Sequence, residues 1–166
     1  TSSSIKNIDD KVIFDNYRSA IKSGKGKLPH KFGNVEKSIN ESASIHEAEY
    51  SVPLLAHACM EPMNATAWYR DGKCDIWAGT QNPLGTRQVT ADTLGIELES
   101  VTVHTAFMGG GFGRRANPDY TNQAAQVSKK SGVPVKLIWS REETTQQDFY
   151  RPSVLGHLKA GLDTKG

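Results

Sequence analysis

The residues of this chain best suited to binding chemistry lie in the run Met108-Gly109-Gly110-Gly111-Phe112-Gly113-Arg114-Arg115. Four glycines fall within five residues, so the backbone can come close to a ligand and adopt positive φ at little steric cost. Exposed N–H groups followed by two guanidinium groups suit a phosphate or another polyanionic group. Glycine-rich runs are also typical of flexible surface loops, and the composition alone leaves that alternative open.

The spacing of these residues excludes two familiar phosphate-binding loops. A dinucleotide fingerprint needs glycines in a G-x-G-x-x-G spacing, and Arg114 stands where the third glycine should be. A Walker A loop needs Gly-Lys followed by Ser or Thr, and the chain has no such sequence. If the run binds an anion, it does so in another way.

Length and charge limit the class of protein. A chain of 166 residues fits one domain, or a compact piece of a larger one. The 20 basic and 18 acidic residues give a formal net charge of only +2, which argues against a general binder of nucleic acids or membrane surfaces. No apolar run approaches the roughly 18 residues of a membrane-spanning helix, so we expect no membrane insertion by this segment.

The metal-binding residue types are scattered along the chain. Cys59 and Cys74 form neither a C-x-x-C pair nor a zinc pattern, and we expect two unpaired core thiols. The five histidines show no H-x-x-x-H or H-E-x-x-H arrangement. A metal held by protein side chains is therefore not expected.

Alternation of apolar and polar residues predicts several short strands. They cover residues 50–58, 65–70, 73–78, 101–107, 133–139 and 155–162. Asp71-Gly72, between two of these strands, is a signal for a two-residue type I′ hairpin turn.

Helical patterns lie before and between these strands. Residues 9–22 have the apolar spacing of a helix, and a basic connector with Gly and Pro follows over 23–31. Asn82-Pro83 and Asn117-Pro118 each place a capping residue before proline, and they open helices that end near Gly95 and Gly132. The order predicts an α+β fold with a mixed β-sheet, two crossover helices and an N-terminal helix.

This order also gives the glycine run a place in the fold. It follows the strand over 101–107 and precedes a helix, so it belongs to a loop at the strand's carboxyl end, where ligands of open α/β sheets bind. Gln81 follows the strand over 73–78 in the same way. We expect Gln81 to reach the same crevice.

Five motifs in register carry a resemblance to a known family: Met60-Glu61-Pro62-Met63-Asn64-Ala65-Thr66-Ala67, Trp77-Ala78-Gly79-Thr80-Gln81-Asn82-Pro83, Gly109 to Arg115, Trp139-Ser140-Arg141-Glu142-Glu143 and Asp148-Phe149-Tyr150-Arg151-Pro152. The chain resembles the large subunit of molybdenum hydroxylases, the xanthine oxidase and aldehyde oxidase group. The G-G-G-F-G-R-R form is most similar to the isoquinoline 1-oxidoreductase β-subunit and related bacterial aldehyde dehydrogenases. The resemblance covers about residues 45–166 and implies part of a molybdopterin-binding domain there, with residues 1–44 as an N-terminal helix and basic linker.

The resemblance implies a cofactor and partners. The parent enzyme would bind molybdopterin with molybdenum, in its cytosine dinucleotide form. It would hydroxylate an aldehyde or an aromatic N-heterocycle, a small-molecule substrate, with oxygen taken from water. Two electrons would leave through [2Fe–2S] clusters on a separate iron–sulfur small subunit. In such enzymes the pterin dithiolene holds the metal, in agreement with the scattered ligand residues.

The resemblance also implies roles for single residues. Gly110, Gly111, Phe112 and Gly113 match the loop that runs under the pterin and the molybdenum, with their backbone N–H groups as donors. Gln81 matches the glutamine that hydrogen-bonds an oxygen on molybdenum. Arg114 is expected either to contact a cofactor phosphate or to form a surface salt bridge.

Two departures from the family pattern limit the expected activity. Ala116 stands where the xanthine-oxidizing branch carries a substrate-binding glutamate. The family's catalytic glutamate lies near the end of the full subunit, so we expect no catalytic residue in this chain. Glu142 and Glu143 are interpreted as a solvated strand end or helix start. We therefore expect one cofactor-contributing domain of a larger subunit, inactive alone; a non-enzymatic anion-binding module and a cofactor-free scaffold are the alternatives.

Overall fold

The computed structural model describes residues 9–166 of the chain. It contains α1 (Asp10–Lys22), α2 (Val35–Asn40), β1 (Ser44–Val52), β2 (Asn64–Arg70), β3 (Lys73–Ala78), α3 (Pro83–Leu94), β4 (Val101–Thr105), α4 (Asp119–Ser131), β5 (Val135–Ile138), α5 (Arg141–Gln146) and β6 (Val154–Leu162). Short 3₁₀ turns cover Leu98–Ser100 and Arg114–Ala116. The chain divides into two compact units, one of residues 56–151 and one of the segments before and after it.

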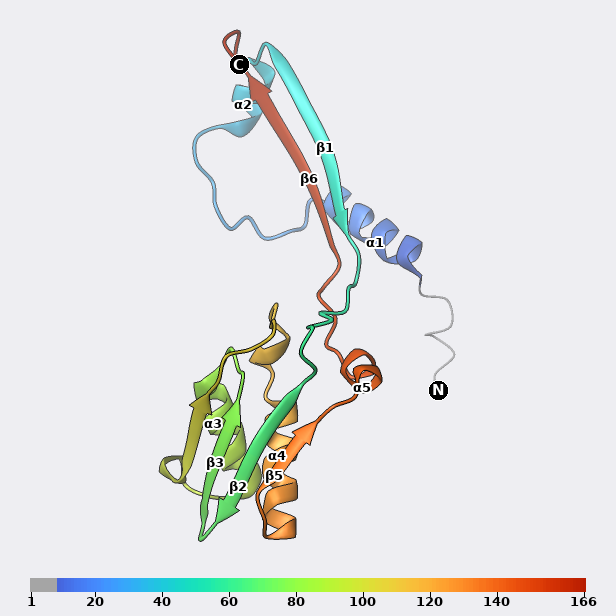
Figure 1. Ribbon diagram of the computed structural model, residues 1–166. Coiled ribbons are helices and arrows are strands. Elements are labelled where there is room, and N and C mark those ends of the chain that lie inside the picture. The colour runs from blue at the N-terminus through green and yellow to red at the C-terminus, as the bar shows by residue number, and fades with distance from the viewer. Residues whose placement is uncertain (1–8) are drawn as a thin grey trace. The chain divides into compact units, whose positions relative to one another are not determined.

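A four-stranded sheet forms the middle of the unit 56–151 (Figure 1). The strand order is β4-β3-β2-β5, with β3 and β4 parallel and the other pairs antiparallel. The β2–β3 turn has φ of +48° at Asp71 and +76° at Gly72, as the type I′ signal requires. The prediction of an α+β fold with a mixed sheet is confirmed.

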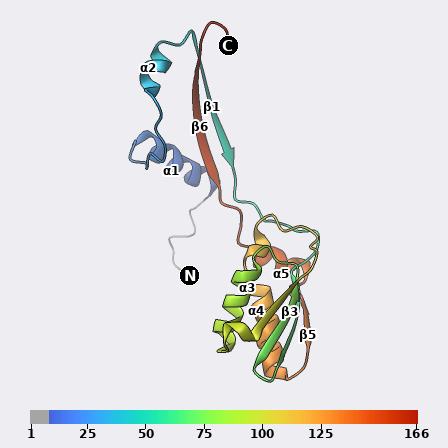
Figure 2. The ribbon, with the colours of Figure 1, turned by 90° about the vertical axis from the view of Figure 1, so that its left-hand side faces the viewer.

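Helices α3 and α4 cover one face of this sheet, as Figure 2 shows. Alternate residues of the strands point into the layer between, for example Cys74, Ile76 and Ala78 of β3. Small residues on α4, including Ala124 and Ala125, are fully buried and let the helix approach the sheet closely. The core of the unit thus lies between one sheet face and two helices.

The two crossover helices start differently. In α3, the Asn82 side chain accepts a hydrogen bond from the Gly85 N–H at 2.9 Å, and Gly95 ends the helix at φ +63°, as predicted. The predicted cap at Asn117 is wrong. Helix α4 begins one residue later than expected, at Asp119, and Pro118 takes the N-cap position without a side-chain hydrogen bond. The 3₁₀ turn just before it leaves Asn117 extended, at φ −84° and ψ 124°.

Strand direction explains why distant motifs meet. The carboxyl ends of β3, β4 and β5 and the start of β2 all lie at one edge of the sheet, since Asn64 pairs with Ile138 and Ala78 with Thr105. The segments that precede β2 and follow β3, β4 and β5 carry the first four motifs of the family resemblance. The sheet therefore gathers these motifs at a single edge.

The other unit contains a two-stranded antiparallel ribbon of β1 and β6, paired from Ser44 with Leu162 to Val52 with Val154. Helices α1 and α2 contact β6. The strand predicted from residue 50 lies earlier, over Ser44–Val52, because Pro53 has no N–H to continue a ladder. Strand β1 pairs with β6 across the whole intervening unit, and the domain boundary at 44/45 stays a prediction. Residues 1–8 of the predicted N-terminal segment lie outside the described residues.

Two further features were not expected or were left open. Helix α2 was not predicted. Glu142 and Glu143 lie exposed in the first turn of α5, where Ser140 and Glu143 form a capping box, so the helix-start interpretation is correct.

Among residues 9–166, no helix combines the length and apolar character needed to cross a bilayer.

Both cysteine thiols are buried and unpaired, as predicted. Burial, reinforced by the neighbouring Asp75, raises the pKa of the Cys74 thiol to about 11. At pH about 8 roughly a thousandth of this thiol is thiolate, the form that reacts with alkylating reagents. We expect Cys74 in the native chain to react orders of magnitude more slowly than in urea, as measured by mass spectrometry of iodoacetamide-treated protein. Equal labelling rates in the two conditions would contradict its burial.

Candidate functional site

The glycine loop at the sheet edge uses backbone conformations that side chains rarely adopt. Gly110 and Gly113 have φ of +96° and +102°, and Phe112 between them has φ of +52°. Positive φ at the non-glycine Phe112 is uncommon and turns its neighbouring peptide groups. The Phe112 ring is 65% exposed. The loop therefore has a defined shape rather than the character of a bare linker.

The backbone N–H groups of this loop divide into paired and free ones. The Gly109 N–H donates to Glu61 Oε2 at 2.7 Å, and the Gly113 N–H to Gln81 Oε1 at 3.0 Å. The N–H groups of Gly110, Gly111 and Phe112 have no hydrogen-bond partner among residues 9–166. Three successive backbone N–H groups without a partner in a turned loop are the kind of donors that suit an anion or a polar ligand edge.

Gln81 lies against this loop, as the sequence predicted. With its Oε1 on the Gly113 N–H, the two N–H groups of Nε2 remain without a partner in the described part of the chain. A Cβ built on Gly111 would come within 2.6 Å of Gln81 Oε1 and 2.7 Å of Cδ, so this contact requires glycine. The exposed Gln81 thus adds side-chain donors beside the free amides.

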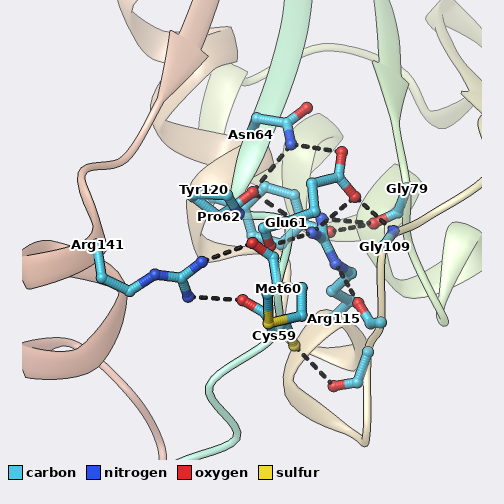
Figure 3. Close-up of polar contacts among 12 residues, drawn as sticks. Cys59, Met60, Glu61, Pro62, Asn64, Gly79, Gly109, Arg115, Tyr120 and Arg141 are labelled. Carbon is cyan, nitrogen blue, oxygen red and sulfur yellow. Dashed lines mark hydrogen bonds and ion pairs between the residues drawn. The ribbon is translucent and has the colours of Figure 1, made fainter.

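Arg115 is the residue that holds the loop from beneath, and sequence reasoning missed it. Its side chain is fully buried, and Figure 3 shows it surrounded by oxygens of three segments. Nε donates to Gly110 O at 2.8 Å, and Nη2 to Glu61 O at 2.8 Å and Glu61 Oε2 at 3.0 Å. Longer contacts reach Gly79 O and Pro62 O, each at 3.4 Å. One guanidinium therefore joins the loop to the chain before β2 and the chain after β3.

Glu61 complements Arg115 from the segment before β2 (Figure 3). Its carboxylate accepts from the Gly109 N–H, from Asn64 Nδ2 at 2.9 Å and from Arg115. Partial burial acts to raise the pKa of Glu61, but the Gly109 N–H, the Asn64 amide and the Arg115 charge outweigh it, so its pKa lies below the ordinary value. Glu61 is therefore ionised at neutral pH and fixes the first residue of the loop.

Two further contacts attach the segment before β2. Arg141 donates to the carbonyls of Cys59 and Met60, each at 2.6 Å (Figure 3). The Cys59 thiol lies 3.5 Å from Gly111 O. Residues from the first four motifs of the sequence therefore converge on one loop.

The sequence that forms this edge belongs to a known domain type. Residues 18–166 match the family model described as the molybdopterin cofactor-binding domain. The chain belongs to this family. The isoquinoline 1-oxidoreductase subunit beta of Brevundimonas diminuta is 34% identical over 119 residues, which is 71% of this chain. The xanthine dehydrogenase molybdenum-binding subunit of Escherichia coli O157:H7 is 35% identical over 113 residues, or 67% of the chain.

A solved structure supports the fold of this molybdopterin-binding domain. The aldehyde oxidoreductase from Desulfovibrio gigas superposes with a TM-score of 0.70 at 22% identity, over 81% of this chain. The chain spans 15% of the length of each of these three proteins. By name these proteins are oxidoreductases, and one of them is a molybdenum-binding subunit. The resemblance stated from the motifs is confirmed at the level of family and fold.

Within this molybdopterin-binding domain, Arg114 has a different position from the one expected. Its side chain is 1% exposed and donates to Asp119 Oδ1 at 2.9 Å and Oδ2 at 2.7 Å. Nε lies 3.2 Å from Asp148 Oδ1, and the guanidinium packs between the rings of Trp139 and Phe149. The phosphate contact of Arg114 stays a prediction that burial and the two carboxylates disfavour, and the expected surface salt bridge is instead a buried one.

The signal for Arg115, Glu61 and Tyr120 was present in the sequence but could not be interpreted there. Tyr120 is fully buried and donates to Gly79 O at 2.8 Å; burial raises its pKa, partly offset by the nearby Arg115 charge. A second arginine after a glycine loop is compatible with ligand binding and with internal support. Only the fold shows that the Arg115 side chain turns inward.

Proposed function

We propose that this chain supplies the loop on which molybdopterin and its molybdenum rest in a larger hydroxylase subunit. The observation that carries the proposal is the set of free donors: the N–H groups of Gly110, Gly111 and Phe112, with the Gln81 amide beside them. These residues occupy the positions that the family resemblance assigns to the cofactor loop.

In this proposal the chain's residues bind and orient, and they move no proton. The loop amides would donate hydrogen bonds to acceptors of a bound pterin, and Gln81 Nε2 would add a side-chain donor beside them. Arg115 and Glu61 hold the loop before the ligand arrives, so the donors need no reorganisation on binding. The cofactor, when bound, supplies the two-electron redox chemistry.

The finer parts of the proposal rest on the resemblance. We infer the cytosine dinucleotide form of molybdopterin, and an aldehyde or N-heteroaromatic substrate hydroxylated with oxygen from water. The electrons would pass to [2Fe–2S] clusters of a separate iron–sulfur subunit, and the rest of the large subunit would supply the base. The exposed Ala116 offers no carboxylate for a purine. The chain alone is therefore expected to be inactive.

The test uses the 166-residue chain and the pterin cofactor released anaerobically from a purified molybdenum hydroxylase. We expect the amide NMR signals of Gly110, Gly111 and Phe112 to shift most on titration. Gln81→Ala should weaken binding about tenfold, equivalent to about 1.4 kcal/mol. Gln88→Ala is the matched control, because Gln88 is also exposed but pairs with Asp92 on α3.

Three results would contradict parts of the proposal. Unmoved loop amides would exclude the loop as the cofactor contact. Equal shifts with cytidine monophosphate alone would favour a general anion-binding module. Reduction of a dye by the isolated chain with cofactor and an aldehyde would show that the chain is active without the rest of the subunit.

A further inference from the structure

A histidine–carboxylate pair lies beneath the far end of the glycine loop. Asp148, which follows α5, accepts a hydrogen bond from the His57 backbone N–H through Oδ2. Its Oδ1 lies 2.9 Å from His57 Nδ1. The side chains of His57 and Asp148 are only 9% and 2% exposed. Both oxygens of one buried carboxylate therefore bind the same residue, which fixes the imidazole ring.

The contacts of Asp148 determine the proton on Nδ1. An ionised carboxylate only accepts hydrogen bonds, and its other neighbour, Arg114 Nε at 3.2 Å, is also a donor. His57 Nδ1 must therefore carry its proton toward Asp148. That leaves Nε2 as the ring atom with hydrogen-bonding capacity to spare, and no residue of the described chain, 9–166, pairs with it.

Nε2 points at the glycine loop. If Gly113 carried a Cβ atom, that atom would lie 3.6 Å from His57 Nε2. Apart from the residues next to Gly113 in the chain, no other heavy atom would lie within 4 Å of it. Gly113 is exposed, and it directly follows Phe112, whose N–H is the last of the three free donors. The ring nitrogen thus lies next to Gly113, the residue that follows the three free donors in the chain.

His57 contacts Asp148, which joins it to a small cluster of charges: Arg114 pairs with Asp148, and Asp119, 26% exposed, pairs with Arg114. Arg114 contributes +1, and Asp119 and Asp148 contribute −1 each, which gives −1 in total. A proton on His57 Nε2 brings the cluster to zero, because the imidazolium adds +1. The protonated ring would also turn Nε2 from an acceptor into a donor directed at the loop.

We propose that His57 is a further anion-contacting residue of the glycine loop, whose imidazolium Nε2–H donates to an anionic oxygen of the bound ligand. The inference rests on the proposed function, in which the loop amides bind a cofactor that carries such oxygens. It adds a charged donor to a set of neutral ones. Asp148 then acts as the positioning residue that sets the ring's orientation and tautomer.

The test uses inorganic sulfate as the probe, because its charge does not change between about pH 5 and pH 8, where histidine titrates. The ring nitrogens and loop amides of the ¹⁵N-labelled chain are followed by NMR as sulfate is added at each pH. We expect the Nε2 signal of His57 to move with sulfate, and affinity to rise about tenfold from the alkaline to the acid end. In His57→Gln that pH dependence should disappear while the amide shifts of Gly110 to Phe112 remain.

His157→Gln is the matched control, since His157 also pairs with a carboxylate, Glu47 at 2.7 Å, in the other unit. It should keep the full pH dependence. Asp148→Asn provides a second variant if His57→Gln does not fold, and it should change the ring tautomer and reduce the pH dependence. The His57 role is overturned if the His57→Gln chain keeps the pH dependence of sulfate affinity seen in the unaltered chain. It is also overturned if sulfate does not move the Nε2 signal of His57. Either result leaves the loop amides as a binding site. Absence of any amide shift with sulfate in the unaltered chain overturns both the anion contact and the site it completes.

Discussion

Replacing Arg115 with methionine is expected to lower the free energy of unfolding of unit 56–151 by about 2–3 kcal/mol. The guanidinium is fully buried and donates to Gly110 O, Glu61 O and Glu61 Oε2. Methionine fills similar volume but leaves the carbonyls of Gly110 and Glu61 without this donor, and an orphaned buried acceptor costs its desolvation. The loss should be larger than for an exposed arginine because Arg115 has no solvent to replace its partners.

Urea unfolding followed by tryptophan fluorescence measures this prediction selectively. All three tryptophans, Trp68, Trp77 and Trp139, lie in unit 56–151. Arg70→Met is the matched control, because Arg70 stacks on Trp68 and pairs with Asp75 at a side-chain exposure of 43%. We expect it to cost at most about 1 kcal/mol. An Arg115→Met chain as stable as Arg70→Met would show that Arg115 does not support the loop.

The sequence predicted the position of the site better than its chemistry. Glycine spacing, the strand before it and the capped helix after Gln81 are local signals, and they correctly placed Gln81 beside Gly113 at a sheet edge. That placement follows from strand direction alone, since parallel β3 and β4 end at the same side. Local sequence patterns are therefore enough to predict where the loop lies relative to the strands.

The partners of the two arginines could not be predicted in the same way. Arg114 and Arg115 are adjacent and chemically identical, but one pairs with Asp119 and Asp148 and the other with Glu61 and carbonyl groups. These partners come from segments up to 54 residues away, so no local period encodes them. The two guanidinium groups were expected to suit an anion, with a surface salt bridge as the alternative for Arg114, and both side chains are buried.

The position of strand β1 was predicted wrongly for a related reason, whereas β6 was predicted to within one residue. Every residue of β1 is exposed, and its Ser-Ile-His-Glu-Ala-Glu-Tyr sequence has no strong alternation between apolar and polar residues. Its pairing with β6 spans more than a hundred residues, as Ser44 pairs with Leu162. A strand with neither a buried face nor a nearby partner leaves little signal in its own sequence.

Replacing Gly111 with alanine should separate binding from folding. The new Cβ would meet Gln81 Oε1 at 2.6 Å, Gln81 Cδ at 2.7 Å and Met108 Sδ at 3.1 Å. These atoms are the far ends of flexible side chains, so they can move at a cost of at most about 1 kcal/mol in stability. Moving Gln81, however, breaks its bond to the Gly113 N–H and displaces the Nε2 donors. We expect pterin cofactor affinity to fall about tenfold or more.

A double-mutant cycle with Gln81→Ala tests whether Gly111 acts through Gln81. If it does, Gly111→Ala should cost little further affinity once Gln81 is alanine, because the side chain that it displaces is absent. The cycle is measured by amide NMR titration with the released pterin cofactor, alongside urea unfolding of each variant. Gly26→Ala is the control, since Gly26 has open space around its Cβ position and no positive φ. If the losses of affinity in the two single variants add up in the double variant, Gly111 does not act through Gln81. The alanine methyl would then block the ligand directly from the Gly110 and Phe112 amides.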